Sequence, residues 1–152
     1  MTPADAAPSA PAADHQLAAD LAHEAGRLLL SIRQELVAAG ASAAELKEQG
    51  DRRAHELLMA RLADARPGDA ILSEEGRDGV GPADTGRLTA QRVWIVDPLD
   101  GTRELSEPPR EDWAVHVALW QDGELIAGAV ALPAQGVTLA TPTVPGLPTA
   151  PA

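Results

Sequence analysis

Residues 93–102 read Val-Trp-Ile-Val-Asp-Pro-Leu-Asp-Gly-Thr and predict a buried strand followed by two carboxylates. The first four residues are apolar and β-branched or aromatic, which is typical of a short core strand. Asp97 follows at the end of this run, and Pro98 hinders a simple continuation because it has no backbone N–H to donate to a neighbouring strand. Asp100 comes three residues later, so we expect the two carboxylates to be turned toward one point.

Two amphipathic helices are predicted on the N-terminal side of this strand. Apolar residues recur at helical spacing over residues 17–36, and Gly40 is a plausible stop. A second helical pattern runs from about residue 51 to 65. After it, the apolar run at 70–72 predicts another strand, and residues 76–86, with four Gly and one Pro, predict a loop.

The C-terminal side of the chain predicts further strands. Residues 113–120 and 124–132 are two strand-like runs separated by Gln-Asp-Gly, and Asp-Gly between such runs is a strong hairpin signal. Another strand is predicted at 137–140. Because the helices come first and the strands after, the order favours an α+β fold, with two N-terminal helices packed on an antiparallel sheet, over alternating βαβ units.

Composition limits what the protein can bind. The chain has 152 residues, with twelve Lys and Arg against twenty-three Asp and Glu, a formal net charge of −11. This excess argues against a nucleic-acid partner and suits cation binding. The absence of cysteine excludes disulfides, thiolate metal sites and cysteine nucleophiles. No apolar stretch nears the ~18 residues of a membrane span and no signal peptide is evident, so we expect a cytoplasmic protein without a membrane partner.

The two ends of the chain differ from its middle. Residues 1–13 and 141–152 hold seven of the thirteen prolines and offer little apolar surface to bury. Such segments are typical of extended or disordered tails. We therefore expect the folded domain to span residues 14–140.

The two aspartates can be interpreted as a metal site or as turn residues. A helix that starts at Gly101 or Thr102 would direct free backbone N–H groups at an anion beside them. A phosphate bound there would need a hard divalent cation to offset the carboxylate charge, and Mg²⁺ is typically held by one or two carboxylates plus substrate phosphates. The alternative is an Asx turn with a helix N-cap, which aspartate commonly provides.

The stretch Asp-Pro-Leu-Asp-Gly-Thr at residues 97–102 resembles the metal-binding signature of the inositol monophosphatase superfamily, a group of lithium-sensitive, magnesium-dependent phosphatases. Residues 71–76 resemble the family's strand followed by Glu-Glu, which implies that Glu74 is a metal ligand; a solvated loop pair is the alternative. Asp51 lies where the family carries an aspartate that pairs with the motif's threonine, here Thr102, to orient the attacking water. Taken alone, Asp51 would be an N-cap of the second helix.

The resemblance implies a role for each matching residue. The implied ligands of two or three Mg²⁺ ions are Glu74, Asp97, the backbone carbonyl of Leu99, and Asp100. The residues implied to act on the attacking water are Asp51, Glu74 and Thr102. The backbone N–H groups of Gly101 and Thr102 would hold the substrate phosphate. No covalent nucleophile is required, because positioning and charge neutralisation carry the chemistry.

Within the superfamily, Arg103-Glu104 after the motif resembles the 3'(2'),5'-bisphosphate nucleotidases of sulfate assimilation, whereas inositol monophosphatases more often have Asn-Phe there. Residues 66–75 and 112–120 also resemble actinobacterial members of that branch. The implied substrate is a small phosphomonoester, 3'-phosphoadenosine 5'-phosphate, which would lose its 3'-phosphate. Inositol 1-phosphate is the alternative substrate within the same superfamily.

One part of the family pattern is missing. The family's second metal also needs an aspartate from a Trp-Asp motif in a C-terminal half, and Trp113 follows Asp112 in the wrong order. The resemblance covers residues 17 to about 140, so we expect the N-terminal half of a layered αβαβα sugar-phosphatase fold in a truncated chain. A metal- or phosphate-binding module without catalytic activity is therefore another alternative.

Overall fold

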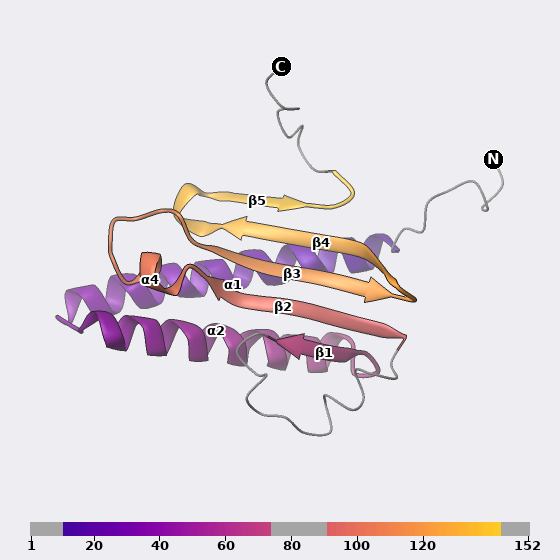
Figure 1. The fold of residues 1–152 in the computed structure, drawn as a ribbon, viewed down its shortest axis with the longest axis horizontal. Coiled ribbons are helices and arrows are strands. Elements are labelled where there is room, and N and C mark those ends of the chain that lie inside the picture. Colours follow the sequence, from indigo (N-terminus) through magenta and orange to yellow (C-terminus); the bar gives the residue numbers. More distant parts are fainter. Residues whose placement is uncertain (1–10, 74–90, 144–152) are drawn as a thin grey trace, which may run out of the picture.

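The computed structural model describes residues 11–73 and 91–143. Two long helices lie against one face of a five-stranded sheet, α1 packing on β3 and β4 and α2 on β2 (Figure 1). In chain order the elements are α1 (Ala12–Ala38), α2 (Ala43–Ala65), β1 (Ala70–Ser73), β2 (Arg92–Asp100), α4 (Thr102–Leu105), β3 (Ala114–Gln121), β4 (Glu124–Leu132), the 3-10 helix η2 (Pro133–Gln135) and β5 (Val137–Ala140). Within these described ranges, no helix is long and apolar enough to span a bilayer.

The sheet follows chain order, β1-β2-β3-β4-β5. The predicted α+β class is confirmed, but the prediction of an antiparallel sheet was wrong for one pair, because β1 and β2 run parallel. A parallel pair needs a connection of about a dozen residues or more, which the segment between β1 and β2 provides. The loop predicted at residues 76–86 lies within this segment, outside the described residues.

The predicted hairpin is confirmed, and its turn has the expected geometry. Strands β3 and β4 pair antiparallel, and Asp122 and Gly123 between them have φ of 49° and 92°. Two successive positive φ angles are typical of a type I′ turn, whose twist matches that of the strands. Strand β5 occupies the predicted residues 137–140 and pairs with β4.

Both helices begin earlier than predicted. Helix α1 begins at Ala12, so Ala12 and Ala13 belong to the fold rather than to the predicted tail. Helix α2 begins after Ser42, whose hydroxyl accepts a hydrogen bond from the backbone N–H of Glu45 at 3.2 Å. Both helices begin with alanines, which favour a helix but do not stand out in a pattern of apolar residues at helical spacing. The predicted starts were therefore too late. Asp51 lies inside α2, so its interpretation as the N-cap was wrong.

The predicted C-terminal tail also begins too early. Thr141 contacts the domain through its backbone N–H, which donates to the carbonyl of Gly128 at 2.9 Å. Its hydroxyl oxygen lies 2.6 Å from Nδ1 of His15 in the first turn of α1. This contact ties the end of β5 to the start of α1. Residues 144–152 lie outside the described part of the chain.

The core lies between the helices and the facing side of the sheet. Alternate residues of β2, β3 and β4 are buried there, as the two-residue period of a strand requires. The residues of this face are Trp94, Val96, Val115, Val117, Leu119, Ala127, Ala129 and Ala131. They meet Leu29 of α1 and Leu58 and Leu62 of α2. The opposite side of the sheet is covered by neither α1 nor α2.

A buried charge network joins the start of α1 to the start of β2. Asp14, only 3% exposed, forms ion pairs with Arg66 at 2.9 Å and with Arg92 at 3.1 Å. Arg92 also pairs with Asp69, which accepts a hydrogen bond from the indole N–H of Trp94 at 2.9 Å. The network thus connects both helices with β1 and β2 at one end of the sheet.

We expect Asp14→Ala to destabilise the fold by about 2 kcal/mol, because it leaves two partly buried guanidinium groups without their shared carboxylate. Urea unfolding monitored by circular dichroism measures this change. Asp20→Ala is the matched control, because Asp20 lies on the same helix but is exposed. Equal stability of the two variants would contradict this role of the network.

Candidate metal centre

A β-bulge near the end of β2 governs where the two aspartates point. The pairing with β3 passes from Asp97–His116 to Asp100–Ala114, so β2 uses one residue more than β3 between these pairs. Such an extra residue is the definition of a bulge. Pro98, which has no N–H to donate, is tolerated there. The strand therefore does not end at Asp97, as predicted, but continues to Asp100.

The bulge brings both carboxylates to the same side of the sheet. In a regular strand, residues three apart point to opposite faces. His116 lies directly opposite Asp97 and therefore shares its face. Since Nε2 of His116 lies 3.0 Å from Oδ2 of Asp100, the carboxylate of Asp100 is on that face as well. Asp97 is half-buried and the side chain of Asp100 is 62% exposed. The site therefore combines a sheltered carboxylate with an accessible one.

Gly101 makes the turn from β2 into the single-turn helix α4. Its φ of 98° lies in the left-handed region, which favours glycine. A Cβ atom there would lie 2.9 Å from Cβ of Trp113 and 3.1 Å from the carbonyl oxygen of Asp112. Asp112 and Trp113, the two residues that precede β3, therefore pack directly against this turn. The predicted helix start at Gly101 or Thr102 is confirmed, with Gly101 as the residue before α4.

Helix α2 contributes Asp51 to the other side of the turn. The hydroxyl of Thr102 donates a hydrogen bond to Oδ1 of Asp51 at 3.2 Å. The preceding residue, Gly50, permits this approach, because a Cβ atom there would lie 2.8 Å from Cδ2 of Leu105 in α4. The structure therefore brings together two residues that are fifty-one positions apart in the chain.

A second polar residue of α2 reaches the end of β1. His55 lies one turn after Asp51, on the same side of the helix. Its Nδ1 is 2.9 Å from the hydroxyl of Ser73, the buried last residue of β1. The next residue is Glu74, which lies outside the described residues together with Glu75, so both interpretations of that pair remain predictions.

Two histidines lie next to residues of the predicted site. His116 contacts Asp100, and His55 contacts the residue before Glu74. The spacing of four between Asp51 and His55 was a signal available in the sequence. No local signal marks His116, because its contact depends on strand register.

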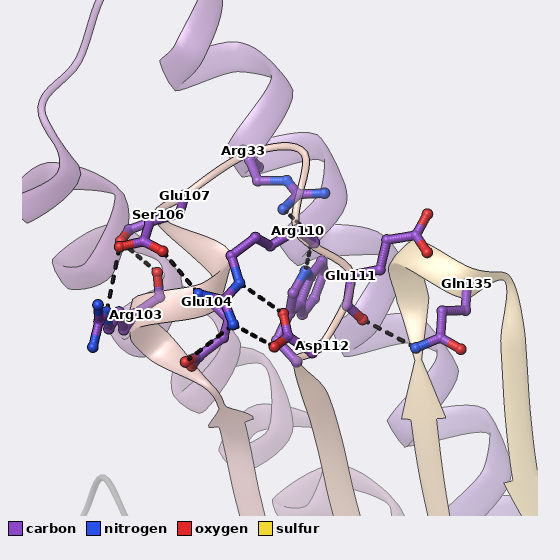
Figure 2. A network of polar contacts seen from close by, with 10 residues as sticks. Arg33, Arg103, Glu104, Ser106, Glu107, Arg110, Glu111, Asp112 and Gln135 are labelled. Carbon is purple, nitrogen blue, oxygen red and sulfur yellow. Dashed lines mark hydrogen bonds and ion pairs between the residues drawn. The ribbon is translucent and has the colours of Figure 1, made fainter.

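The loop after α4 holds a network of exposed charges, drawn in Figure 2. Arg110 pairs with Glu107 at 3.0 Å and with Asp112, and its guanidinium holds the pKa of both carboxyls below their usual values. The carbonyl of Arg110 accepts hydrogen bonds from Arg33 at 2.8 Å and from the indole N–H of Trp113 at 3.1 Å. The network thereby fixes the loop that packs under the turn at Gly101.

The donors at the bulge fit a hard cation. Asp97, Asp100 and the carbonyl of Leu99 offer only oxygen, which Mg²⁺ prefers, and one or two carboxylates are the usual protein share of a magnesium site. Among the described residues, no group of three or more His, Cys, Asp or Glu side chains could hold a metal ion by itself. Of the carboxylate ligands that the family resemblance implies, the described part of the chain therefore supplies Asp97 and Asp100.

Comparison with known proteins identifies the family whose sequence this chain resembles. The sequence profile of the Inositol monophosphatase family matches residues 12–146. A 3'-phosphoadenosine 5'-phosphate phosphatase of Mycobacterium leprae is 54% identical over 132 residues, which cover 81% of this chain and 46% of the relative. One of the same name from Mycobacterium tuberculosis is 51% identical over 127 residues, covering 80% and 45%.

A solved structure shares the fold as well. CysQ from Bacteroides thetaiotaomicron, described as a bacterial member of the inositol monophosphatase family, superimposes with a TM-score of 0.67 at 28% identity. The match covers 89% of this chain and 47% of that structure. The chain thus spans about half the length of the relatives it matches.

Proposed function

Because the chain belongs to the inositol monophosphatase family, we propose that it provides the metal-binding part of a Mg²⁺-dependent phosphomonoesterase that removes the 3'-phosphate of 3'-phosphoadenosine 5'-phosphate. The observation that carries the proposal is the bulge in β2, which turns Asp97 and Asp100 to one face just before Thr102, the residue whose hydroxyl hydrogen-bonds to Asp51. The names of the mycobacterial relatives support this substrate. Such a small nucleotide is consistent with a cytoplasmic enzyme.

In this proposal each residue has a defined task. Asp97, Asp100, the carbonyl of Leu99 and Glu74 hold Mg²⁺, which when bound neutralises phosphate charge and lowers the pKa of water. The hydroxyl of Thr102 donates a hydrogen bond to Asp51, so the lone pairs of its oxygen can accept a hydrogen bond from the attacking water. This contact orients the water toward phosphorus. The backbone N–H groups of Gly101 and Thr102 bind phosphate oxygens at the turn.

Phosphate release tests the proposal directly. The whole enzyme, of which this chain would provide the metal-binding part, is expected to release phosphate from 3'-phosphoadenosine 5'-phosphate in the presence of Mg²⁺, and EDTA is expected to abolish the release. Turnover of inositol 1-phosphate in place of the nucleotide would move the assignment to the other branch of the family. Mg²⁺ binding by calorimetry without turnover of either substrate would favour a binding module that lacks catalytic activity.

Thr102→Val should lower kcat about 100-fold with little change in KM, because it removes the hydroxyl that orients the water, and misplacing a reacting group by about 1 Å can cost about 100-fold. Steady-state phosphate release measures both constants. Thr102→Ser keeps the hydroxyl and is the control, for which we expect nearly full activity. An equal loss in both variants would assign the threonine a packing role instead.

A further inference from the structure

We propose that His116 is a positioning residue for the metal centre, and that it holds the carboxylate of Asp100 in the orientation that binds Mg²⁺. The inference rests on the proposed function, because it takes Asp100 to be a metal ligand. It adds a residue from β3, a strand to which neither the motif nor the preceding proposal assigns a role.

The hydrogen bond between the two side chains has a defined direction. An ionised carboxylate can only accept hydrogen bonds, so Nε2 of His116 donates to Oδ2 of Asp100 across 3.0 Å. This leaves Oδ1 and the remaining lone pairs of Oδ2 for a cation. Carboxylates that bind metals in proteins are themselves usually hydrogen-bonded by a neighbouring group that sets their orientation. The geometry of this pair matches that arrangement.

His116 is well placed to fix Asp100, because its own backbone is held on both sides. It pairs with Asp97 of β2 and with Val130 of β4, in the central strand of the sheet. Asp100, in contrast, is the last residue of its strand, follows the bulge, and has a side chain that is 62% exposed. A side chain so exposed has rotamer freedom to lose when it binds an ion. The hydrogen bond from His116 removes part of this freedom before the ion arrives.

The surroundings of His116 allow substitutions that test this role. His116 borders a hollow on the side of the sheet away from the helices, together with Ala118, Gly128 and Val130. A leucine or glutamine of similar size fits there without displacing the buried core. His116→Leu removes the N–H group, whereas His116→Gln retains an amide N–H donor near the position of Nε2. His23, exposed on α1, provides the matched control His23→Leu.

The experiment is Mg²⁺ titration of the full 152-residue chain by calorimetry, combined with the melting temperature of each variant without metal. We expect His116→Leu to bind Mg²⁺ about tenfold more weakly, the lower end of the effect seen for groups that orient metal ligands. His116→Gln should recover most of the affinity, and His23→Leu should match the unsubstituted chain. The metal-free melting temperatures should be nearly equal.

The outcomes separate this inference from the proposed function. If the unsubstituted chain binds Mg²⁺ and His116→Leu binds it equally well or more tightly, the positioning role is overturned while the metal site stands. An equal loss in the Leu and Gln variants also overturns it, because the N–H group would then be irrelevant. A lower melting temperature without a change in affinity would show a purely structural contact and overturn it too. If the unsubstituted chain does not bind Mg²⁺, the metal site and this inference are both wrong.

Discussion

Asp97→Asn is expected to weaken Mg²⁺ binding by about 100-fold or more. Residues that merely orient metal ligands contribute about 10- to 100-fold to affinity, so a direct ligand should contribute at least as much. Asp97 is the more sheltered of the two aspartates, and the family resemblance implies that it is a metal ligand. Asparagine keeps the shape but loses the negative charge that offsets the cation. Calorimetric titration with Mg²⁺ measures the change.

A second substitution separates ligation from the general effect of charge. Asp122→Asn also raises the net charge by one, but Asp122 lies in the β3–β4 turn, where its φ of 49° suits asparagine equally well. We expect its Mg²⁺ affinity to equal that of the unsubstituted chain. If Asp97→Asn and Asp122→Asn bind Mg²⁺ alike, Asp97 is not a ligand and the assignment of the metal centre fails.

Gly101→Ala is expected to lower the free energy of unfolding by about 4 kcal/mol. Two costs add here: a non-glycine residue at positive φ costs about 1–3 kcal/mol, and forcing extra volume into packed surroundings costs about 1–3 kcal/mol. The new Cβ would meet the backbone and Cβ of Trp113, which is itself fully buried and cannot easily move away. Urea unfolding monitored by tryptophan fluorescence measures the loss.

Gly40→Ala is the matched control for Gly101→Ala. Gly40 also has a positive φ, of 75°, but nothing lies within 4 Å of the position of a Cβ atom. The control therefore experiences the backbone strain alone, and we expect a loss of only about 1 kcal/mol. If the two variants lose the same stability, the close packing of Trp113 against the turn contributes nothing, and the turn's role in positioning Thr102 would need another explanation.

Local features of the fold were predictable, and features that depend on distant segments were not. The β3–β4 hairpin could be predicted because Asp122 and Gly123 specify a turn whose geometry needs no further partner. The parallel pairing of β1 with β2 could not, since no residue of either strand indicates the direction of its neighbour. The early start of α2 was missed because the stretch before Asp51 carries helix formers rather than a clear apolar stripe.

The same distinction applies to the site. Asp97 and Asp100 lie three residues apart, so the sequence alone suggested that they act together. The bulge that makes this possible could not be predicted, because it is defined by the register of β2 against β3. His116 was missed for the same reason. Asp51 and Thr102 were paired only through the family resemblance, and the structure brings them within hydrogen-bond distance.

The contact between His15 and Thr141 has a practical consequence. It places the beginning of α1 beside the end of β5, so the described chain enters and leaves the domain at neighbouring points. This junction adjoins Asp14, whose partner Arg92 begins β2, while Asp100 ends that nine-residue strand at its far end. A tag, fused reporter or surface anchor attached before Pro11 or after Thr143 would therefore leave from the end of the sheet opposite the metal centre. Immobilised preparations should keep the approach to Asp100 open to small phosphate esters.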